Sequence, residues 1–218
     1  MISKEKCIVV LSGGPDSVTV AYWAQAQGYT VSGLTFTYGQ IALKEIQSAQ
    51  QVAAELGIPL QIIDLSSLKE IFQGVTSLVD ENIHMTSTFS QPIIVPFRNG
   101  IFLSVAVAYA NSVHATRIFY GAQRSDAAFY PDCREVFYAS FEQTARLGTD
   151  TPIVIDAPFS DIPKSEIIKL GTQLEVPYHL TWSCYLNKTQ HCGQCESCRN
   201  RKNAFLDAGI NDPTQYLN

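Results

Sequence analysis

The sequence lacks a hydrophobic run suited to crossing a bilayer, although 46% of its 218 residues are hydrophobic. An uncharged stretch at residues 99–116 is interrupted by Asn111, Ser112 and His114, so its apolar part is too short to span a membrane. We interpret this stretch as a buried helix and expect no membrane partner.

A secretory signal, internal repeats and a basic excess are also missing. The N-terminal sequence MISKEKCIVV passes directly into an apolar run, which is not the form of a signal peptide. The chain has 15 basic and 20 acidic residues, a net charge of −5, which argues against the basic face that nucleic acids require. We therefore expect a cytoplasmic protein that acts on small molecules and has no nucleic-acid partner. Its length suffices for one large core with a small appendage.

Short apolar runs alternate with segments of helical period along most of the chain. The predicted strands are residues 7–11, 31–36, 60–65, 117–120 and 153–157. The predicted helices are residues 17–26, 42–56, 101–113, 135–147 and 164–174. This alternation predicts an α/β fold with a doubly wound, mostly parallel sheet of Rossmann-like type.

Two long connections and the C-terminal tail break this rhythm. The connections at residues 76–97 and 122–134 should lie at the carboxyl edge of the sheet, where ligands bind in such folds. The tail does not continue the pattern. We therefore predict a nucleotide-binding domain at residues 1–180 and a small metal-binding subdomain at residues 181–218.

The first predicted strand runs into Ser-Gly-Gly-Pro-Asp-Ser, which is typical of an anion-binding turn. Two glycines allow backbone N–H groups to converge on one point, and the helix that follows adds its positive end. Ser12 and Ser17 can donate hydroxyl hydrogens to phosphate oxygens, and Asp16 can hold Mg²⁺. The turn has neither the Gly-Lys-Ser/Thr ending of a Walker loop nor the Gly-x-Gly-x-x-Gly dinucleotide pattern. A tight turn with a capping side chain is the alternative.

Four of the six cysteines lie close together near the C-terminus. Cys184, Cys192, Cys195 and Cys198 have the spacing x7, x2 and x2. Four thiolates suit a closed tetrahedral zinc site, with Cys198 in the first turn of a last helix. An iron–sulfur cluster and a site in which His191 replaces one cysteine are the alternatives, and disulfides are not expected in the cytoplasm.

The turn and the cysteines together resemble the 7-cyano-7-deazaguanine synthase family of the N-type ATP pyrophosphatases. The matching segments extend over nearly the whole chain: LSGGPDS at 11–17, FTYGQ at 36–40, VPFRN at 95–99, YPDCR at 130–134 and TWSC…CGQCESC at 181–198. The chain departs from the family pattern at Pro15, where Leu is usual, and at Val18, where Thr is usual. It also has Ala-Ala-Phe at 127–129, where the family usually has x-Ser-Gly.

The resemblance implies an ATP-dependent ligase that converts 7-carboxy-7-deazaguanine and ammonia to the nitrile by adenylating first the carboxylate and then the amide. It implies the cofactors ATP, Mg²⁺ and structural Zn²⁺. In the ATP site it implies Leu11, Ser12, Gly13, Gly14, Asp16 and Ser17. Asp16, Ser17, Lys164 and Arg98 would act in catalysis, with Lys164 stabilising the leaving pyrophosphate and Arg98 pairing with the substrate carboxylate.

The deazaguanine presents N–H donors on its pairing edge, which a carboxylate recognises well. Asp126 and Asp132 are the candidates, and Tyr130 or Phe97 could stack on the ring. On sequence alone, Lys164 and Arg98 could equally be solvated surface residues. Cys133 has no identifiable base partner, so we expect a buried residue rather than a nucleophile.

Other functions remain open at this point. A tRNA-thiolating enzyme or an amide-forming ligase could use the same turn, although the net charge disfavours an RNA substrate. A non-enzymatic zinc ribbon would bind no ATP. The sequence also permits a homodimer, as is common in the family.

Overall fold

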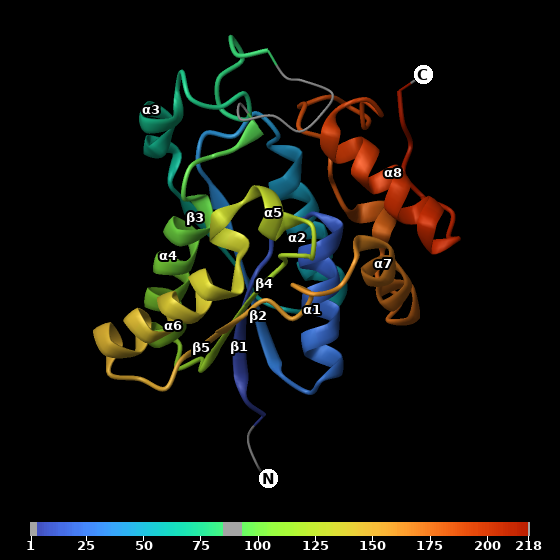
Figure 1. Cartoon of the computed structure of the whole chain (residues 1–218). Helices are drawn as coiled ribbons and strands as arrows, with labels where there is room; N and C mark the ends of the chain where they lie inside the picture. Colours follow the sequence, from blue (N-terminus) through green and yellow to red (C-terminus); the bar gives the residue numbers. More distant parts are fainter. Residues whose placement is uncertain (1–3, 85–92, 218) are drawn as a thin grey trace.

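A five-stranded parallel sheet forms the centre of the protein, as Figure 1 shows for the computed structural model, which describes residues 4–84 and 93–217. Its strands are β1 (Lys6–Val10), β2 (Thr30–Thr37), β3 (Leu60–Asp64), β4 (Arg117–Tyr120) and β5 (Val154–Asp156). The strand order is β3-β2-β1-β4-β5, and every pairing is parallel. The chain runs outward in opposite directions from β1 and from β4, so the two strands flank a switch point where ligands bind in such sheets.

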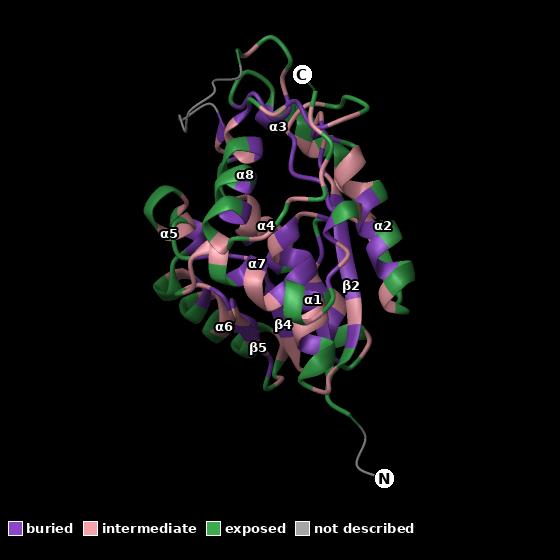
Figure 2. Ribbon diagram, turned by 90° about the vertical axis from the view of Figure 1, so that its right-hand side faces the viewer, coloured by how far each residue is buried: buried purple, intermediate pink, exposed green. Residues whose placement is uncertain are grey.

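Helices cover both faces of the sheet. One layer contains α1 (Pro15–Ala26), α2 (Lys44–Leu56), α7 (Lys164–Gln173) and α8 (Glu196–Ala208), and the other contains α4 (Arg98–Ser112) and α6 (Glu135–Thr149) (Figure 1). The short helices are α3 (Lys69–Phe72) and α5 (Asp126–Phe129), with single turns at Ser66–Leu68, Pro131–Cys133 and Tyr178–Leu180. Figure 2 shows α2 buried on one side and exposed on the other, as expected for a covering helix.

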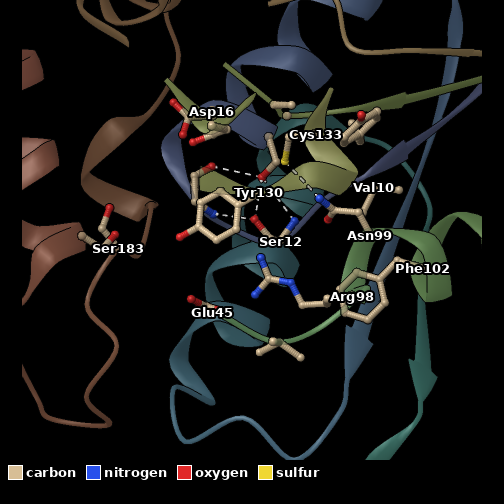
Figure 3. A pocket seen from close by; sticks show the side chains of 18 of the residues that line it. Val10, Ser12, Asp16, Glu45, Arg98, Asn99, Phe102, Tyr130, Cys133 and Ser183 are labelled. Carbon is tan, nitrogen blue, oxygen red and sulfur yellow. Dashed lines mark hydrogen bonds between the residues drawn. The ribbon is translucent and has the colours of Figure 1, made fainter. Parts of the chain in front are cut away.

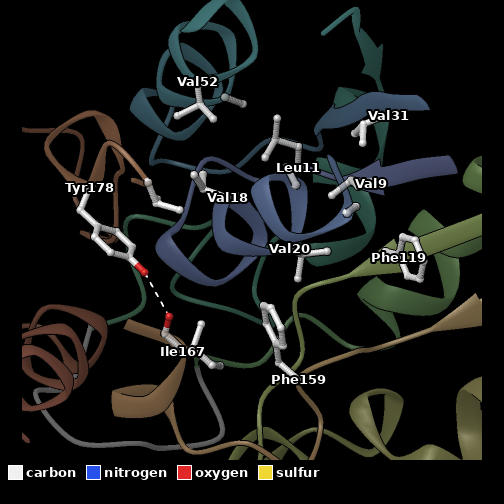
Figure 4. Packing of buried hydrophobic residues seen from close by; sticks show 14 of the residues in the cluster. Val9, Leu11, Val18, Val20, Val31, Val52, Phe119, Phe159, Ile167 and Tyr178 are labelled. Carbon is white, nitrogen blue, oxygen red and sulfur yellow. Dashed lines mark hydrogen bonds between the residues drawn. The ribbon is translucent and has the colours of Figure 1, made fainter. Parts of the chain in front are cut away.

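The central strand contributes to two hydrophobic cores. Cys7 and Val9 of β1, with Leu11 just after it, belong to the cluster with α1 and α7 (Figure 4). Ile8 and Val10 face the cluster with α4 and α6. Because both faces are covered, residues 7–10 of β1 are all apolar rather than alternating with polar residues. Each fully buried aliphatic side chain of this kind contributes roughly 1.5–3 kcal/mol.

The predicted fold class and the order of strands and helices are confirmed, and the differences lie at the boundaries. The first helix begins at Pro15 instead of residue 17, and α4 begins at Arg98 instead of residue 101. The helices α3 and α5 were not predicted; α5 lies inside one of the two long connections. None of the helices in the described ranges is long and apolar enough to cross a membrane.

The C-terminal tail is anchored by a buried arginine. Arg201 of α8 is fully buried and forms an ion pair with Asp212 at 3.1 Å. Its guanidinium also donates to the Thr181 hydroxyl at 2.6 Å and to the Tyr178 carbonyl at 2.9 Å. Phe205, one turn further along α8, belongs to the same core cluster as α1 and α7. The tail therefore packs directly on the sheet-covering helices, and the division at residue 180 stays a prediction.

Candidate active site

The turn between β1 and α1 holds its two serines close together. The Ser12 and Ser17 hydroxyl oxygens are 3.0 Å apart, and the Ser12 N–H donates to Ser17 Oγ at 3.2 Å. Gly13 has a φ of +84°, and a Cβ there would lie 2.3 Å from the Glu45 carbonyl oxygen. Pro15 occupies the first turn of α1. The turn thus places two hydroxyls side by side at the N-terminus of α1, an arrangement that suits an anion.

Asp16 and Lys164 meet beside this turn from different parts of the chain. The Lys164 ammonium lies 2.6 Å from Asp16 Oδ2, and both side chains are largely buried. Burial works against the charge of Lys164, but the neighbouring Asp16 outweighs it and raises the pKa of the lysine. Asp16 Oδ1 is buried and has no hydrogen-bond partner among the described residues. A free carboxylate oxygen next to an anion turn is a fitting ligand for Mg²⁺ on phosphate.

An open cavity of about 280 Å³ extends from this turn along the carboxyl ends of β1, β2 and β4 (Figure 3). The sequence-predicted residues that line it are Leu11, Ser12, Gly14, Asp16, Ser17, Arg98, Asp126, Tyr130, Asp132 and Lys164. Gly13 supports the turn from behind, against α2. The cavity therefore brings together predicted residues from four separate segments of the chain.

Arg98 extends from the first turn of α4 into the cavity. Its Nη1 donates to the Tyr38 hydroxyl at 3.1 Å, and Figure 3 shows the guanidinium between Tyr130 and Glu45. Burial opposes its charge, but Tyr38 and Glu45 raise the pKa of the guanidinium further. A fixed cation with unused donors can bind a substrate carboxylate through two hydrogen bonds.

Asp126 and Asp132 lie in the cavity wall and already accept hydrogen bonds. Asp126 accepts from the Gln123 backbone N–H at 3.0 Å and from the Gln123 amide at 2.9 Å. Burial and the nearby Asp16 raise the pKa of Asp126 to about 6. Asp132 accepts from the Asn99 N–H at 2.9 Å and so caps the start of α4. Both carboxylates are therefore held in place by neighbours before any ligand binds.

Cys133 follows Asp132 and is buried, as expected from its sequence. Its thiol accepts from the Asn99 amide at 3.2 Å. Burial, with Asp126 and Asp132 nearby, raises the pKa of the Cys133 thiol, so the sulfur is protonated and poorly nucleophilic.

Phe97 is the predicted substrate-binding residue that lies outside the cavity. It has a φ of +56°, is 58% exposed and is not among the residues that line the cavity. Its ring turns back over Gly100 and packs edge-on against Phe137. Tyr130 is the aromatic of the predicted pair that the structure places in the cavity.

Sequence reasoning missed one wall of the cavity. Trp182, Ser183, Tyr185, Glu196, Ser197 and Asn200 of the C-terminal tail line it, as do Tyr38, Gln40 and Glu45 near the start of α2. The signals were present, because FTYGQ and the cysteine segment were both recognised as family motifs. Their proximity to the phosphate turn depends on long-range packing, such as the hydrogen bond from the Trp182 N–H to the Gly13 carbonyl at 2.9 Å.

The four predicted cysteine ligands converge in the tail. The sulfur atoms of Cys184, Cys192, Cys195 and Cys198 all lie within 4.8 Å of one another, and together they could hold a metal ion. Backbone N–H groups of Leu186 and Cys192 donate to Cys184 Sγ at 3.4 Å, as suits a thiolate ligand. All six cysteines are free of disulfides.

His191, the alternative ligand, does not belong to this cluster of four sulfur atoms. Its Nε2 accepts from the Ser183 N–H at 3.0 Å, and its ring lies 4.1 Å from that of Trp182. Burial and the nearby Arg201 lower the pKa of His191 to about 4, so the ring is neutral. The histidine therefore connects the loop that carries the cysteines to the cavity wall.

Solved structures of other proteins share this architecture. NMN synthetase from Francisella tularensis has a TM-score of 0.54 at 18% identity and covers 96% of this chain and 79% of its own. A 4-thiouridine synthetase–RNA complex with bound ATP has a TM-score of 0.53 at 16% identity, covering 94% of this chain and 51% of its own. At these identities the likeness concerns the fold. An α/β fold with this arrangement of elements is therefore what the chain shares with them.

The sequence comparisons are more specific. The family described as "Queuosine biosynthesis protein QueC" matches residues 6–209. A 7-cyano-7-deazaguanine synthase from Caldicellulosiruptor bescii is 37% identical over 214 residues, 97% of each chain. One from Nitratiruptor sp. is 41% identical over 218 residues, covering 97% of this chain and 98% of the relative. The chain therefore belongs to the 7-cyano-7-deazaguanine synthase family, as its motifs predicted.

Proposed function

We propose that this protein uses ATP to convert 7-carboxy-7-deazaguanine and ammonia to 7-cyano-7-deazaguanine, releasing AMP and pyrophosphate. Family membership supports the substrate class. The observation that carries the chemistry is the pairing of Asp16 with Lys164 beside the anion turn, in one cavity with Arg98. An ATP-dependent carbon–nitrogen ligase needs these three functions together: a pyrophosphate site, a charge-stabilising lysine and a carboxylate anchor.

The first step makes the carboxylate reactive. A carboxylate is a poor electrophile, and transfer of AMP to its oxygen creates a good leaving group. Arg98 would hold the carboxylate, while Ser12, Ser17 and the turn's N–H groups hold the β- and γ-phosphates. Lys164 would stabilise the charge that grows on the departing pyrophosphate. Ammonia then displaces AMP and gives the amide. A second adenylation, on the amide oxygen, lets that oxygen leave as part of AMP, and the nitrile forms.

Two metals belong to the proposal. Mg²⁺, when bound, would neutralise phosphate charge, and Asp16 Oδ1 is the carboxylate oxygen free to hold it. Zn²⁺ suits the four-cysteine cluster, because four thiolates within one small sphere leave no open position for catalysis. We further propose a cytoplasmic enzyme that needs no nucleic acid and forms a homodimer.

The test is turnover with ATP, ammonium and 7-carboxy-7-deazaguanine, with products identified by mass spectrometry. We expect the nitrile and AMP from the unmodified protein. Asp16→Asn should lower pyrophosphate release by about 100-fold, because it removes a metal ligand and the partner of Lys164. Asp150→Asn is the matched control, since Asp150 is exposed and has the left-handed backbone that asparagine tolerates. ADP as product, or unchanged turnover in Asp16→Asn, would overturn the proposal.

A further inference from the structure

The carboxylates that line the cavity differ in their hydrogen bonds and ion pairs. Asp16 pairs with Lys164, Asp126 accepts from Gln123, and Asp132 accepts from Asn99. Glu196 accepts from the Tyr185 hydroxyl at 2.9 Å and from the Asn200 amide. Glu45 is the fifth, and no hydrogen bond or ion pair with another described residue engages its carboxylate.

The backbone of Glu45 packs against the turn between β1 and α1. It lies in the first turn of α2, and its backbone carbonyl packs against Gly13 of the phosphate turn. Figure 3 shows its carboxylate beside the Arg98 guanidinium, which donates a hydrogen bond to the Tyr38 hydroxyl. The Glu45 carboxylate and the Arg98 guanidinium thus face the same cavity without forming a direct ion pair. The carboxylate is therefore available to a ligand.

Ammonia is the co-substrate whose chemistry needs such a group. At neutral pH an amine of this kind is largely protonated, as lysine is, and ammonium has no lone pair with which to attack. A carboxylate next to the acyl group can attract the cation and remove its proton. Resting on the proposed function, we propose that Glu45 binds ammonium and acts as the general base that converts it to ammonia at the carboxylate held by Arg98.

The step balances as follows. Glu45 takes one proton from NH₄⁺ and becomes a neutral carboxylic acid. The nitrogen lone pair forms the C–N bond to the adenylated carbon, the C–O bond to AMP breaks, and AMP leaves with that electron pair. The nitrogen then loses a second proton to water, and Glu45 releases its own proton to solvent before the next turnover.

The electrostatic environment of Glu45 suits this role. Burial raises the pKa of Glu45 to about 7, with Arg98 acting in the opposite direction. Arg98 of α4 and Tyr38 after β2 are the ionisable groups that interact with it across the cavity. A base with a pKa near the working pH can both accept and release a proton in each cycle.

The experiment compares Glu45→Gln with Glu55→Gln, an exposed glutamate on the same helix. Three rates are measured at neutral pH: ATP–pyrophosphate exchange with 7-carboxy-7-deazaguanine alone, amide formation from ammonium, and hydroxamate formation from hydroxylamine. Hydroxylamine is largely uncharged at this pH and needs no base to expose its lone pair. Thermal unfolding of each variant checks that it is folded.

We expect Glu45→Gln to lower the ammonium-dependent rate by about 100-fold. Exchange and hydroxamate formation should stay within a few-fold of the unmodified protein, and raising the pH should restore part of the ammonium reaction. Glu55→Gln should match the unmodified protein in all three assays. An equal loss with hydroxylamine, or a loss of exchange, would show that Glu45 positions Arg98 or the deazaguanine substrate. Either result would overturn the inference. Absence of exchange in the unmodified protein would instead overturn the proposed function itself.

Discussion

At the scale of single residues, Asp126 should make the folded protein less stable as the pH rises. Its pKa is about 6 in the folded state, because burial and Asp16 oppose its charge, against 3.8 for an unperturbed aspartate. The folded state therefore holds a proton between these values that the unfolded chain has already released. The contribution of Asp126 to the free energy of unfolding is therefore greatest below about pH 4 and is lost as the pH rises through 6.

Asp126→Asn removes this titration. We expect the free energy of unfolding of the variant, relative to that of the unmodified protein, to be higher at pH 8 than at pH 5 by roughly 1–2 kcal/mol. Urea unfolding at the two pH values measures the difference, and any constant effect of the substitution cancels. Asp161→Asn, at an exposed position, should show no such trend. A gain that is equal at both pH values would contradict the assignment of this pKa to Asp126.

The proximity of site residues was predictable from sequence where they are close along the chain. Ser12, Ser17 and Asp16 adjoin one turn, so their types and spacing were sufficient to place them together. Phe97 illustrates the limit, because its backbone adopts a positive φ and directs the ring toward Phe137 instead of the cavity. Nothing in the residue type or its neighbours signals that conformation.

At the scale of elements, the phosphate turn depends on the close approach of α2. A Cβ on Gly13 would lie 2.3 Å from the Glu45 carbonyl oxygen and 2.9 Å from the Ala49 nitrogen, and φ is +84°. Gly13→Ala should therefore destabilise the protein by roughly 2–3 kcal/mol and weaken ATP binding, because α2 must move away. Urea unfolding and calorimetry with ATP and Mg²⁺ measure the two effects.

Gly14→Ala provides the control one residue away. Its φ is −77°, and the nearest atom to an added Cβ is Ser12 Oγ at 3.5 Å, an ordinary contact. The stability of this variant should change by less than about 1 kcal/mol. If Gly13→Ala were as stable as Gly14→Ala, the contact with α2 would not constrain the turn.

Hydrophobic periodicity predicted the order of strands and helices. Their ends were harder to predict, because they depend on contacts with residues distant in sequence. The run at residues 7–11 is apolar on both faces, which identified a central strand before its neighbours were known. The start of α4 at Arg98 is three residues earlier than its periodicity indicated, because Asp132 caps the Asn99 N–H from another segment. Such a cap becomes visible only when the chain is folded.

At the scale of the whole molecule, the tail connects the four-cysteine cluster to the turn between β1 and α1. Trp182 donates its backbone N–H to the Gly13 carbonyl and its indole N–H to the Cys184 carbonyl at 2.7 Å. Cysteine spacing predicted the cluster, because the ligands are close in sequence. It did not predict that the residues around the cluster form a wall of the active-site cavity.

Loss of the metal should therefore affect ATP binding as well as stability. In Cys198→Ser the first turn of α8 loses its ligand, and Arg201 on the next turn anchors both Thr181 and Asp212. We expect the melting temperature to fall by about 10 °C, which corresponds to several kcal/mol for a chain of this length, and ATP affinity to fall with it. Cys133→Ser, outside the cluster, should keep one zinc per chain by elemental analysis. If Cys198→Ser lost its zinc yet bound ATP unchanged at temperatures where it is folded, the tail would stabilise the protein without shaping the phosphate turn.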